Sequence, residues 1–239
     1  MKINGFADDV LMGQAAAEYI EKLIISKIER GGTFILALSG GRSPETTYAC
    51  LTKKNIDWRK VYIILTDERF VPKEHPDSNY KMINDIFISR INIPLENIIS
   101  PDTSLINAEK CAKSHELQLK KLFRFKENHN LLFPSIDLVC LGIGDDGHTA
   151  SLFPGDNSLN ENKKWILNTK APENFPVKNR ITFTLPLINN ADHAIFIVSG
   201  KNKRKIIEKV RLGEKNLPAN LVKTKNETVL FLDNRSIEY

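Results

Sequence analysis

Hydrophobic residues follow two patterns along the chain, and the first of them is helical. Between residues 8 and 30 the apolar positions recur at intervals of three, four and seven, at Val10, Ala17, Ile20, Ile24 and Ile28. This spacing predicts an amphipathic helix, and the Gly31-Gly32 pair that follows is a typical end for one. The same reasoning predicts further helices within residues 44–51, 79–91, 107–125 and 201–213.

The second pattern is a set of short runs that are apolar throughout and rich in β-branched residues. They predict strands within residues 33–41, 61–68, 136–144, 180–189, 193–200 and 227–233. Strands without polar alternation are typical of a parallel sheet that is covered on both faces. Because these strands alternate with helices, we expect an α/β fold with a doubly wound, mostly parallel sheet and helices on both faces, a Rossmann-like three-layer sandwich.

No repeat, low-complexity tract or long linker divides the sequence, so we expect residues 1–239 to form a single domain. Apolar residues make up 41% of the chain and charged residues 26%, which is typical of a soluble globular protein. No apolar run approaches the roughly 18 residues of a membrane span. The first twenty residues carry acids where a signal peptide has its apolar stretch, and the three cysteines are far apart. These features favour a cytoplasmic protein with reduced thiols and no membrane partner.

The formal charge of +5 has two functional interpretations, a nucleic-acid surface and a basic cleft for a small anion. The lysines are spread along the chain, and the densest basic group, residues 201–205, has no interleaved aromatic residues. We therefore expect no nucleic-acid partner, while a generally solvated basic surface stays open as an alternative. The sequence is compatible with a monomer or a small homo-oligomer.

In an α/β sheet, ligands bind beyond the carboxyl ends of the strands. The first turn in such a place has the sequence SGGRSPETTY, residues 39–48, with a predicted helix starting near Pro44. Free backbone N–H groups and a helix dipole favour an anion there. The turn matches neither of the two nucleotide-binding glycine patterns, G-x-x-x-x-G-K-[ST] and G-x-G-x-x-G. Phosphate binding and a plain tight turn both remain open, and Arg42 favours the first.

The next turn carries Asp67, Glu68 and Arg69 after a predicted buried strand. Acids in this position can cap a helix or form an ion pair, and for Glu68 we prefer that structural interpretation. Arg69 is a candidate to bind a phosphate or to polarise a carbonyl, because its planar guanidinium suits oxyanions. His75, in the polar loop that follows, is a weaker candidate for substrate contact.

Further cations lie near strand ends. Arg180 precedes a predicted strand, while Lys201 and Lys203 follow another. Lysines at the start of a helix oppose its dipole at a cost of a few tenths of a kcal/mol each, and a bound anion would offset that cost. The alternative, solvated lysines on a basic protein, stays open for both and is weaker for Lys203.

Residues 137–155, DLVCLGIGDDGHTASLFPG, bring one histidine, His148, to the end of an apolar strand. A metal site is disfavoured because no second histidine or cysteine accompanies Asp145 and Asp146. A nucleophilic Ser151 is disfavoured because the G-x-S-x-G pattern is absent. The remaining chemistry is a general acid or base with a neighbouring acid to orient its ring. On these residues alone, a core or capping histidine remains open.

Taken together, these segments resemble the 6-phosphogluconolactonases of the oxidative pentose phosphate pathway over nearly the whole chain. The resemblance rests on the blocks LALSGGRSP, TDERFVP with DSNYKM, GIGDDGHTASLFPG, RITFTLPLINNA and LPANLV, in this order. A sister family, the glucosamine-6-phosphate deaminases, shares the fold, the glycine turn and the DGH triplet. In the deaminases DGH is followed by IAFNEP, whose glutamate belongs to the catalytic machinery, and here Phe153 occupies that position. A phenylalanine cannot assist proton transfer, so the lactonases are favoured.

The resemblance implies hydrolysis of a small sugar-phosphate lactone, 6-phospho-D-glucono-1,5-lactone, with neither metal nor cofactor. It implies that His148 activates water as general base, that Asp146 orients it, and that Arg69 binds substrate near the reacting end. The remaining expected substrate- or phosphate-binding residues are Ser39, Gly40, Gly41, Arg42, Asp67, Arg180 and Lys203. Many members have a small residue and threonine where this chain has Arg42 and Ser43. A deaminase or isomerase, and a non-catalytic sugar-phosphate sensor, remain as alternatives.

Overall fold

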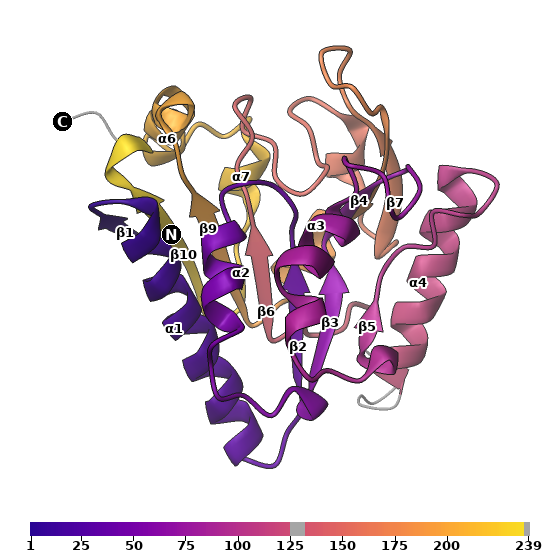
Figure 1. Ribbon diagram of the computed structural model, residues 1–239. Helices are drawn as coiled ribbons and strands as arrows, with labels where there is room; N and C mark the ends of the chain where they lie inside the picture. The colour runs from indigo at the N-terminus through magenta and orange to yellow at the C-terminus, as the bar shows by residue number, and fades with distance from the viewer. Residues whose placement is uncertain (125–131, 237–239) are drawn as a thin grey trace.

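The computed structural model describes residues 1–124 and 132–236 (Figure 1). Its centre is a seven-stranded sheet in the order β1-β10-β9-β6-β2-β3-β5, and every neighbouring pair is parallel. The predicted parallel α/β sheet is therefore confirmed. The strands are β1 (Lys2–Phe6), β2 (Phe34–Leu38), β3 (Val61–Leu65), β5 (Ile98–Ile99), β6 (Leu138–Leu141), β9 (His193–Val198) and β10 (Glu227–Asp233).

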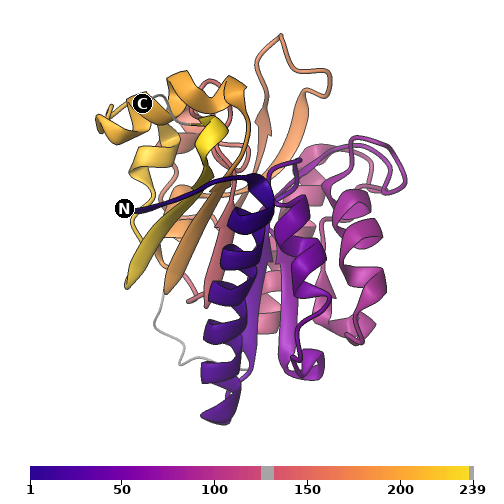
Figure 2. The ribbon, with the colours of Figure 1, turned by 60° about the vertical axis from the view of Figure 1, so that its left-hand side comes forward.

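Layers of apolar side chains cover both faces of this sheet, because its strands are apolar on both sides. On β2, Leu36 and Leu38 pack against one layer, while Ile35 and Ala37 pack against the other. The first layer belongs to α1 (Asp9–Glu29), α2 (Glu45–Leu51) and α3 (Asn79–Ile86), which lie side by side in Figures 1 and 2. The second belongs to α4 (Ala108–Arg124), α5 (Leu185–Asn189), α6 (Arg204–Arg211), α7 (Pro218–Leu221) and a small second sheet.

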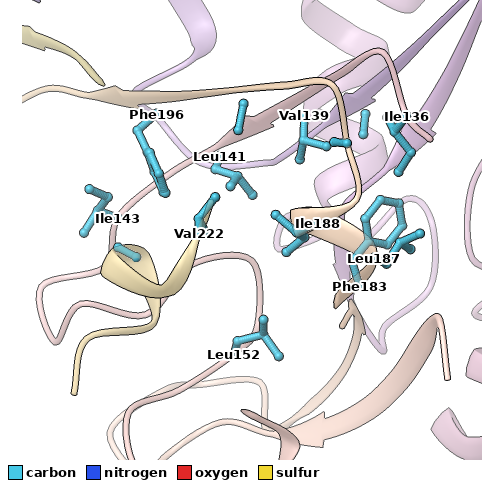
Figure 3. Close-up of a cluster of buried hydrophobic side chains, with 14 of the residues drawn as sticks. Ile136, Val139, Leu141, Ile143, Leu152, Phe183, Leu187, Ile188, Phe196 and Val222 are labelled. Atoms are coloured by element: carbon cyan, nitrogen blue, oxygen red, sulfur yellow. The ribbon is translucent and has the colours of Figure 1, made fainter. Parts of the chain in front are cut away.

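Figure 3 shows part of the second layer, where side chains of the large sheet meet those of the segments that cover it. Val139, Leu141 and Phe196 face the cluster that includes Phe183 and Ile188, and all are almost completely buried. Full burial of such side chains is worth roughly 1.5–3 kcal/mol each. This layer therefore fixes the small second sheet against the large one.

The small sheet is antiparallel, with the order β4-β8-β7, and the sequence did not predict it. Its strands are β4 (Asp67–Arg69), β7 (Ile166–Lys170) and β8 (Asn179–Phe183). The single strand predicted over 61–68 is therefore wrong, because β3 ends at Leu65 and Asp67 begins a strand of another sheet. Arg180, expected to precede a strand, lies within β8.

Two other predicted elements differ in extent. The strand predicted over 180–189 ends at Phe183, because Thr184 caps α5 by accepting the N–H of Leu187. The helix predicted over 79–91 ends at Ile86 and continues as the short 3-10 turn Ile88–Arg90. Within α1, Val10 is 51% exposed and does not belong to the apolar face. Residue 125, the last of the helix predicted over 107–125, lies outside the described residues.

The order of the strands creates a crevice at one point. From β2 the chain continues to β3 and β5 on one side, whereas from β6 it continues to β9 and β10 on the other. β2 and β6 are neighbouring strands, and the chain leaves their carboxyl ends in opposite directions along the sheet. Ligands bind at such a point in open α/β sheets. Separately, within residues 1–124 and 132–236 no helix is long and apolar enough to span a membrane.

Candidate active site

A cleft of about 1070 Å³ opens at the carboxyl ends of the parallel strands, at the crevice between β2 and β6. The structure brings together at this cleft all ten residues that the sequence singled out for catalysis or binding. They are Ser39, Gly40, Gly41, Arg42, Asp67, Arg69, Asp146, His148, Arg180 and Lys203. Two weaker candidates, His75 and Lys201, belong to the described residues but do not line the cleft.

The turn after β2 is shaped by its glycines. Gly41 has a φ of 101°, a conformation that favours glycine. A Cβ on Gly40 would lie 1.9 Å from Oδ1 of Asn79, so the first residue of α3 can pack against this turn only because residue 40 is glycine. Arg42 follows on the exposed rim of the cleft. The turn therefore presents backbone and a cation to the cleft.

The turn after β6 holds His148 beside an acid. Nδ1 of the imidazole lies 2.5 Å from Oδ1 of Asp146, and the same oxygen accepts the backbone N–H of His148 at 3.0 Å. The turn is closed by backbone bonds from Gly147 to Gly144 and from Gly144 to His148, both 2.9 Å. This arrangement occupies Nδ1 and leaves Nε2 as the ring nitrogen available to a molecule in the cleft.

A histidine and a lysine lower the pKa values of the two acids in this turn. Burial raises the pKa of Asp146, but its hydrogen bond to His148 and the charge of that ring outweigh burial and hold the pKa below its usual range. Asp145 behaves in the same way towards Lys203, whose Nζ lies 2.7 Å from Oδ1 of Asp145. Lys203 also donates to the carbonyl of Ile143 at 2.8 Å. The ammonium group is therefore fixed to the histidine-bearing turn.

Two aromatic rings enclose the imidazole. The ring of Phe153 lies 4.9 Å from that of His148, and the ring of Phe175 lies 5.5 Å from it at an interplanar angle of 76°. The two phenylalanines are in contact with each other at 5.4 Å. The side chain of His148 is consequently only 20% exposed.

Gly144→Ala is expected to displace the imidazole. A Cβ at this position would lie 2.0 Å from Nδ1 of His148, a distance that real Cβ contacts do not adopt. We expect the substitution to break the bond between His148 and Asp146, which a long-range ¹H–¹⁵N spectrum detects as a shift of the Nδ1 signal. Gly142→Ala is the matched control, because a Cβ there meets nothing within 4 Å. An unchanged Nδ1 signal in Gly144→Ala would contradict this geometry.

The small sheet supplies two arginines to one wall of the cleft. Arg69 of β4 and Arg180 of β8 are directly opposed in the antiparallel register. Arg69 donates to the carbonyl of Asp77 at 2.7 Å. Arg180 is only 5% exposed, and its Nε has no hydrogen-bond partner among the described residues. Burial, reinforced by the charge of Arg69, lowers the pKa of Arg180. Like charges directly opposed destabilise a strand pair, so this wall is suited to an anion.

The two acids next to Arg69 have different surroundings. Asp67 is nearly buried at the cleft, where one oxygen accepts the hydroxyl of Ser151 at 2.7 Å. Glu68 does not line the cleft. It accepts the N–H groups of Asn79 and Tyr80, both at 2.7 Å, at the start of α3. Burial raises the pKa of Glu68 despite these hydrogen bonds. The structural interpretation of Glu68 as a helix cap is thus confirmed.

Several residues that line the cleft were not singled out as binding residues from the sequence: Asn79, Asn174, Phe175, Asn202 and Arg235. Asn202 and Arg235 follow β9 and β10, so the rule that ligands bind beyond parallel strand ends could have found them. Phe175 lies in the loop between β7 and β8, and no sequence signal placed that loop beside the cleft. Of the residues within 1–124 and 132–236, no group of three or more His, Cys, Asp and Glu could hold a metal ion.

Comparisons with known proteins identify relatives over most of the chain. A sequence model described as glucosamine-6-phosphate isomerases/6-phosphogluconolactonase matches residues 7–231. A protein of Synechocystis sp. named 6-phosphogluconolactonase is 34% identical over 218 residues, which cover 90% of this chain and 88% of that protein.

Solved structures share the fold. A 6-phosphogluconolactonase from Thermotoga maritima matches with a TM-score of 0.80 and 28% identity, over 98% of this chain and 99% of that one. A monomeric glucosamine-6-phosphate deaminase matches with a TM-score of 0.82 at 22% identity, over 99% of this chain and 98% of that one. Two activities therefore occur on this fold, and only the residues of the cleft can distinguish them.

Proposed function

The chain belongs to the glucosamine-6-phosphate isomerase/6-phosphogluconolactonase family, and from this premise we propose that it hydrolyses 6-phospho-D-glucono-1,5-lactone to 6-phospho-D-gluconate. The observation that carries this choice is Phe153. It stands at the position of the deaminases' catalytic glutamate and packs against the ring of His148. A buried phenyl ring offers no group for proton transfer, whereas lactone hydrolysis needs only one base at this point.

The cations of the cleft would bind the substrate through its phosphate. We assign the phosphate to the Ser39-Gly40-Gly41 turn together with Arg42, Arg180 and Lys203. Backbone N–H groups before a helix, a guanidinium and an ammonium group all favour a dianion. Holding the phosphate fixes the lactone ring relative to the base, which converts binding energy into positioning of the reacting atoms.

The reaction itself would begin at Nε2 of His148. The imidazole takes a proton from water as the water oxygen attacks C1 of the lactone. Arg69 stabilises the negative charge that develops on the carbonyl oxygen. The bond between C1 and the ring oxygen then breaks, and the ring oxygen takes the proton back from the imidazolium. Asp146, bound to Nδ1, keeps Nε2 free to accept the proton and stabilises the charged ring. Asp67 supports the site from beside Arg69.

The first test is a progress curve for freshly generated 6-phospho-D-glucono-1,5-lactone with the purified protein. We expect hydrolysis well above the uncatalysed background at the same pH, because a positioned general base typically supplies about 10² to 10⁴ in rate. Proton release in a weakly buffered solution follows the reaction directly. Heat-treated protein is the control for buffer catalysis.

A folded protein without acceleration would exclude the lactonase. Ammonia release from glucosamine 6-phosphate would then identify a deaminase. Stabilisation by 6-phosphogluconate without turnover of either substrate would identify a sensor. We also retain a monomer or small homo-oligomer in the cytoplasm as the expected state of the protein.

A further inference from the structure

The loop between β7 and β8, residues 171–178, carries an aromatic side chain to the cleft from outside the parallel sheet. In Figures 1 and 2 this loop stands out beyond the end of the sheet. It is fastened internally, because Ala171 donates to the carbonyl of Lys178 at 2.8 Å and Phe175 donates to that of Pro172 at 3.0 Å. The ammonium group of Lys178 also bonds to the carbonyl of Glu173. The loop therefore holds Phe175 in a defined place.

Phe175, Phe153 and His148 form a closed group of three rings, with centroids 4.9–5.5 Å apart. The bond between Nδ1 and Asp146 fixes one atom of the imidazole, but by itself it leaves the ring able to swing about that atom. Phe153 contacts the ring at a tilt of 43° and Phe175 contacts it edge-on at 76°, so the two together restrict this swing. Phe153 is buried in the core, whereas Phe175 belongs to the loop.

The ring of Phe175 is itself held from a further direction. The guanidinium carbon of Arg180 lies 5.9 Å from its centroid, within the range of a cation–π contact. Arg180 is buried, and its strand position is fixed by the pairing of β8 with β4. Phe175 thus spans the distance between a rigid strand and the imidazole.

We propose that Phe175 is a positioning residue that holds the ring of His148 with Nε2 directed at the water that attacks the lactone. This inference rests on the proposed function of His148 as general base. It adds to that function a residue from the β7–β8 loop, which no motif in the sequence indicates. Because a base must lie within hydrogen-bond reach of the proton it takes, a ring that swings spends less time in the reactive geometry.

The test compares kcat and KM of Phe175→Leu and Phe175→Tyr on 6-phospho-D-glucono-1,5-lactone. An aromatic pair contact is worth about as much as a two- to tenfold change in rate, so we expect Phe175→Leu to lower kcat about two- to tenfold. KM should change less than about threefold, because the assigned phosphate contacts are left in place. Phe175→Tyr keeps the ring and should restore kcat. Phe133→Leu, which alters a half-buried phenylalanine outside the cleft, is the matched control and should leave kcat unchanged.

A double-mutant cycle separates positioning from a general loss of structure. In the His148→Ala background, Phe175→Leu should cause no further loss of kcat, because the ring that it positions is absent. An additive loss, or wild-type kcat in Phe175→Leu alone, would overturn the inference while leaving the lactonase intact. Absence of turnover in the wild-type protein would instead overturn the proposed function, and the inference with it.

Discussion

Replacing His148 with alanine is expected to lower kcat for 6-phospho-D-glucono-1,5-lactone by about 10² to 10⁴, the range typical of removing a general base. The imidazole presents a free ring nitrogen that can accept a proton, because Asp146 occupies Nδ1 and leaves Nε2 available. The loss should fall on kcat. KM should stay within a few-fold of wild type, since the assigned phosphate contacts come from other turns. Initial rates corrected for spontaneous hydrolysis measure both constants.

A second variant, Asp146→Asn, is expected to have a smaller effect on kcat than His148→Ala. An asparagine keeps the size of the side chain but cannot stabilise the imidazolium, so kcat should fall by less than in His148→Ala. Binding of 6-phosphogluconate, measured by calorimetry, is the control that His148→Ala keeps a formed cleft. Wild-type turnover in His148→Ala would show that His148 is not the general base.

The large sheet could be predicted because its strands are apolar on both sides, and this pattern follows from burial on both faces. Leu36 and Ile35 illustrate it, since adjacent residues of β2 enter different apolar layers. The small sheet could not be predicted in this way. β4 consists of Asp67–Arg69, which carries no apolar side chain, and only its pairing with β8 makes it a strand. Tertiary contact, which local propensity does not report, decides such a segment.

The residues of the candidate site also differ in whether the sequence alone could locate them. Residues in the turn after an apolar parallel strand, such as Gly41 and His148, could be located because strand ends of one sheet share an edge. Phe175 could not, because it reaches the cleft from an antiparallel hairpin whose place depends on packing against the large sheet. The sequence also could not predict that Arg69 lies opposite Arg180, because the two residues are far apart in the sequence and their register depends on the pairing within the small sheet.

Arg180→Met is expected to change stability and substrate binding in opposite directions. In the free protein Arg180 is buried, its Nε lacks a partner within the described part of the chain, and Arg69 opposes it. Replacing such a cation with an apolar side chain of similar volume should raise the free energy of unfolding by about 1 kcal/mol. In the complex the same guanidinium would meet the phosphate. Losing a charge-assisted hydrogen bond of about 1.5–3 kcal/mol should raise KM roughly 10- to 100-fold.

Urea unfolding and steady-state kinetics on the same preparation measure the two effects. Lys201→Met is the matched control, because it removes a cation from an exposed position that does not line the cleft, so KM and stability should stay close to wild type. A further readout is the rise in melting temperature caused by 6-phosphogluconate, which should be smaller in Arg180→Met than in the wild-type protein. Wild-type KM in Arg180→Met would remove this arginine from the anion site. A loss of stability would show that the acids around it, Asp67, Glu68 and Asp77, already compensate its charge before any ligand binds.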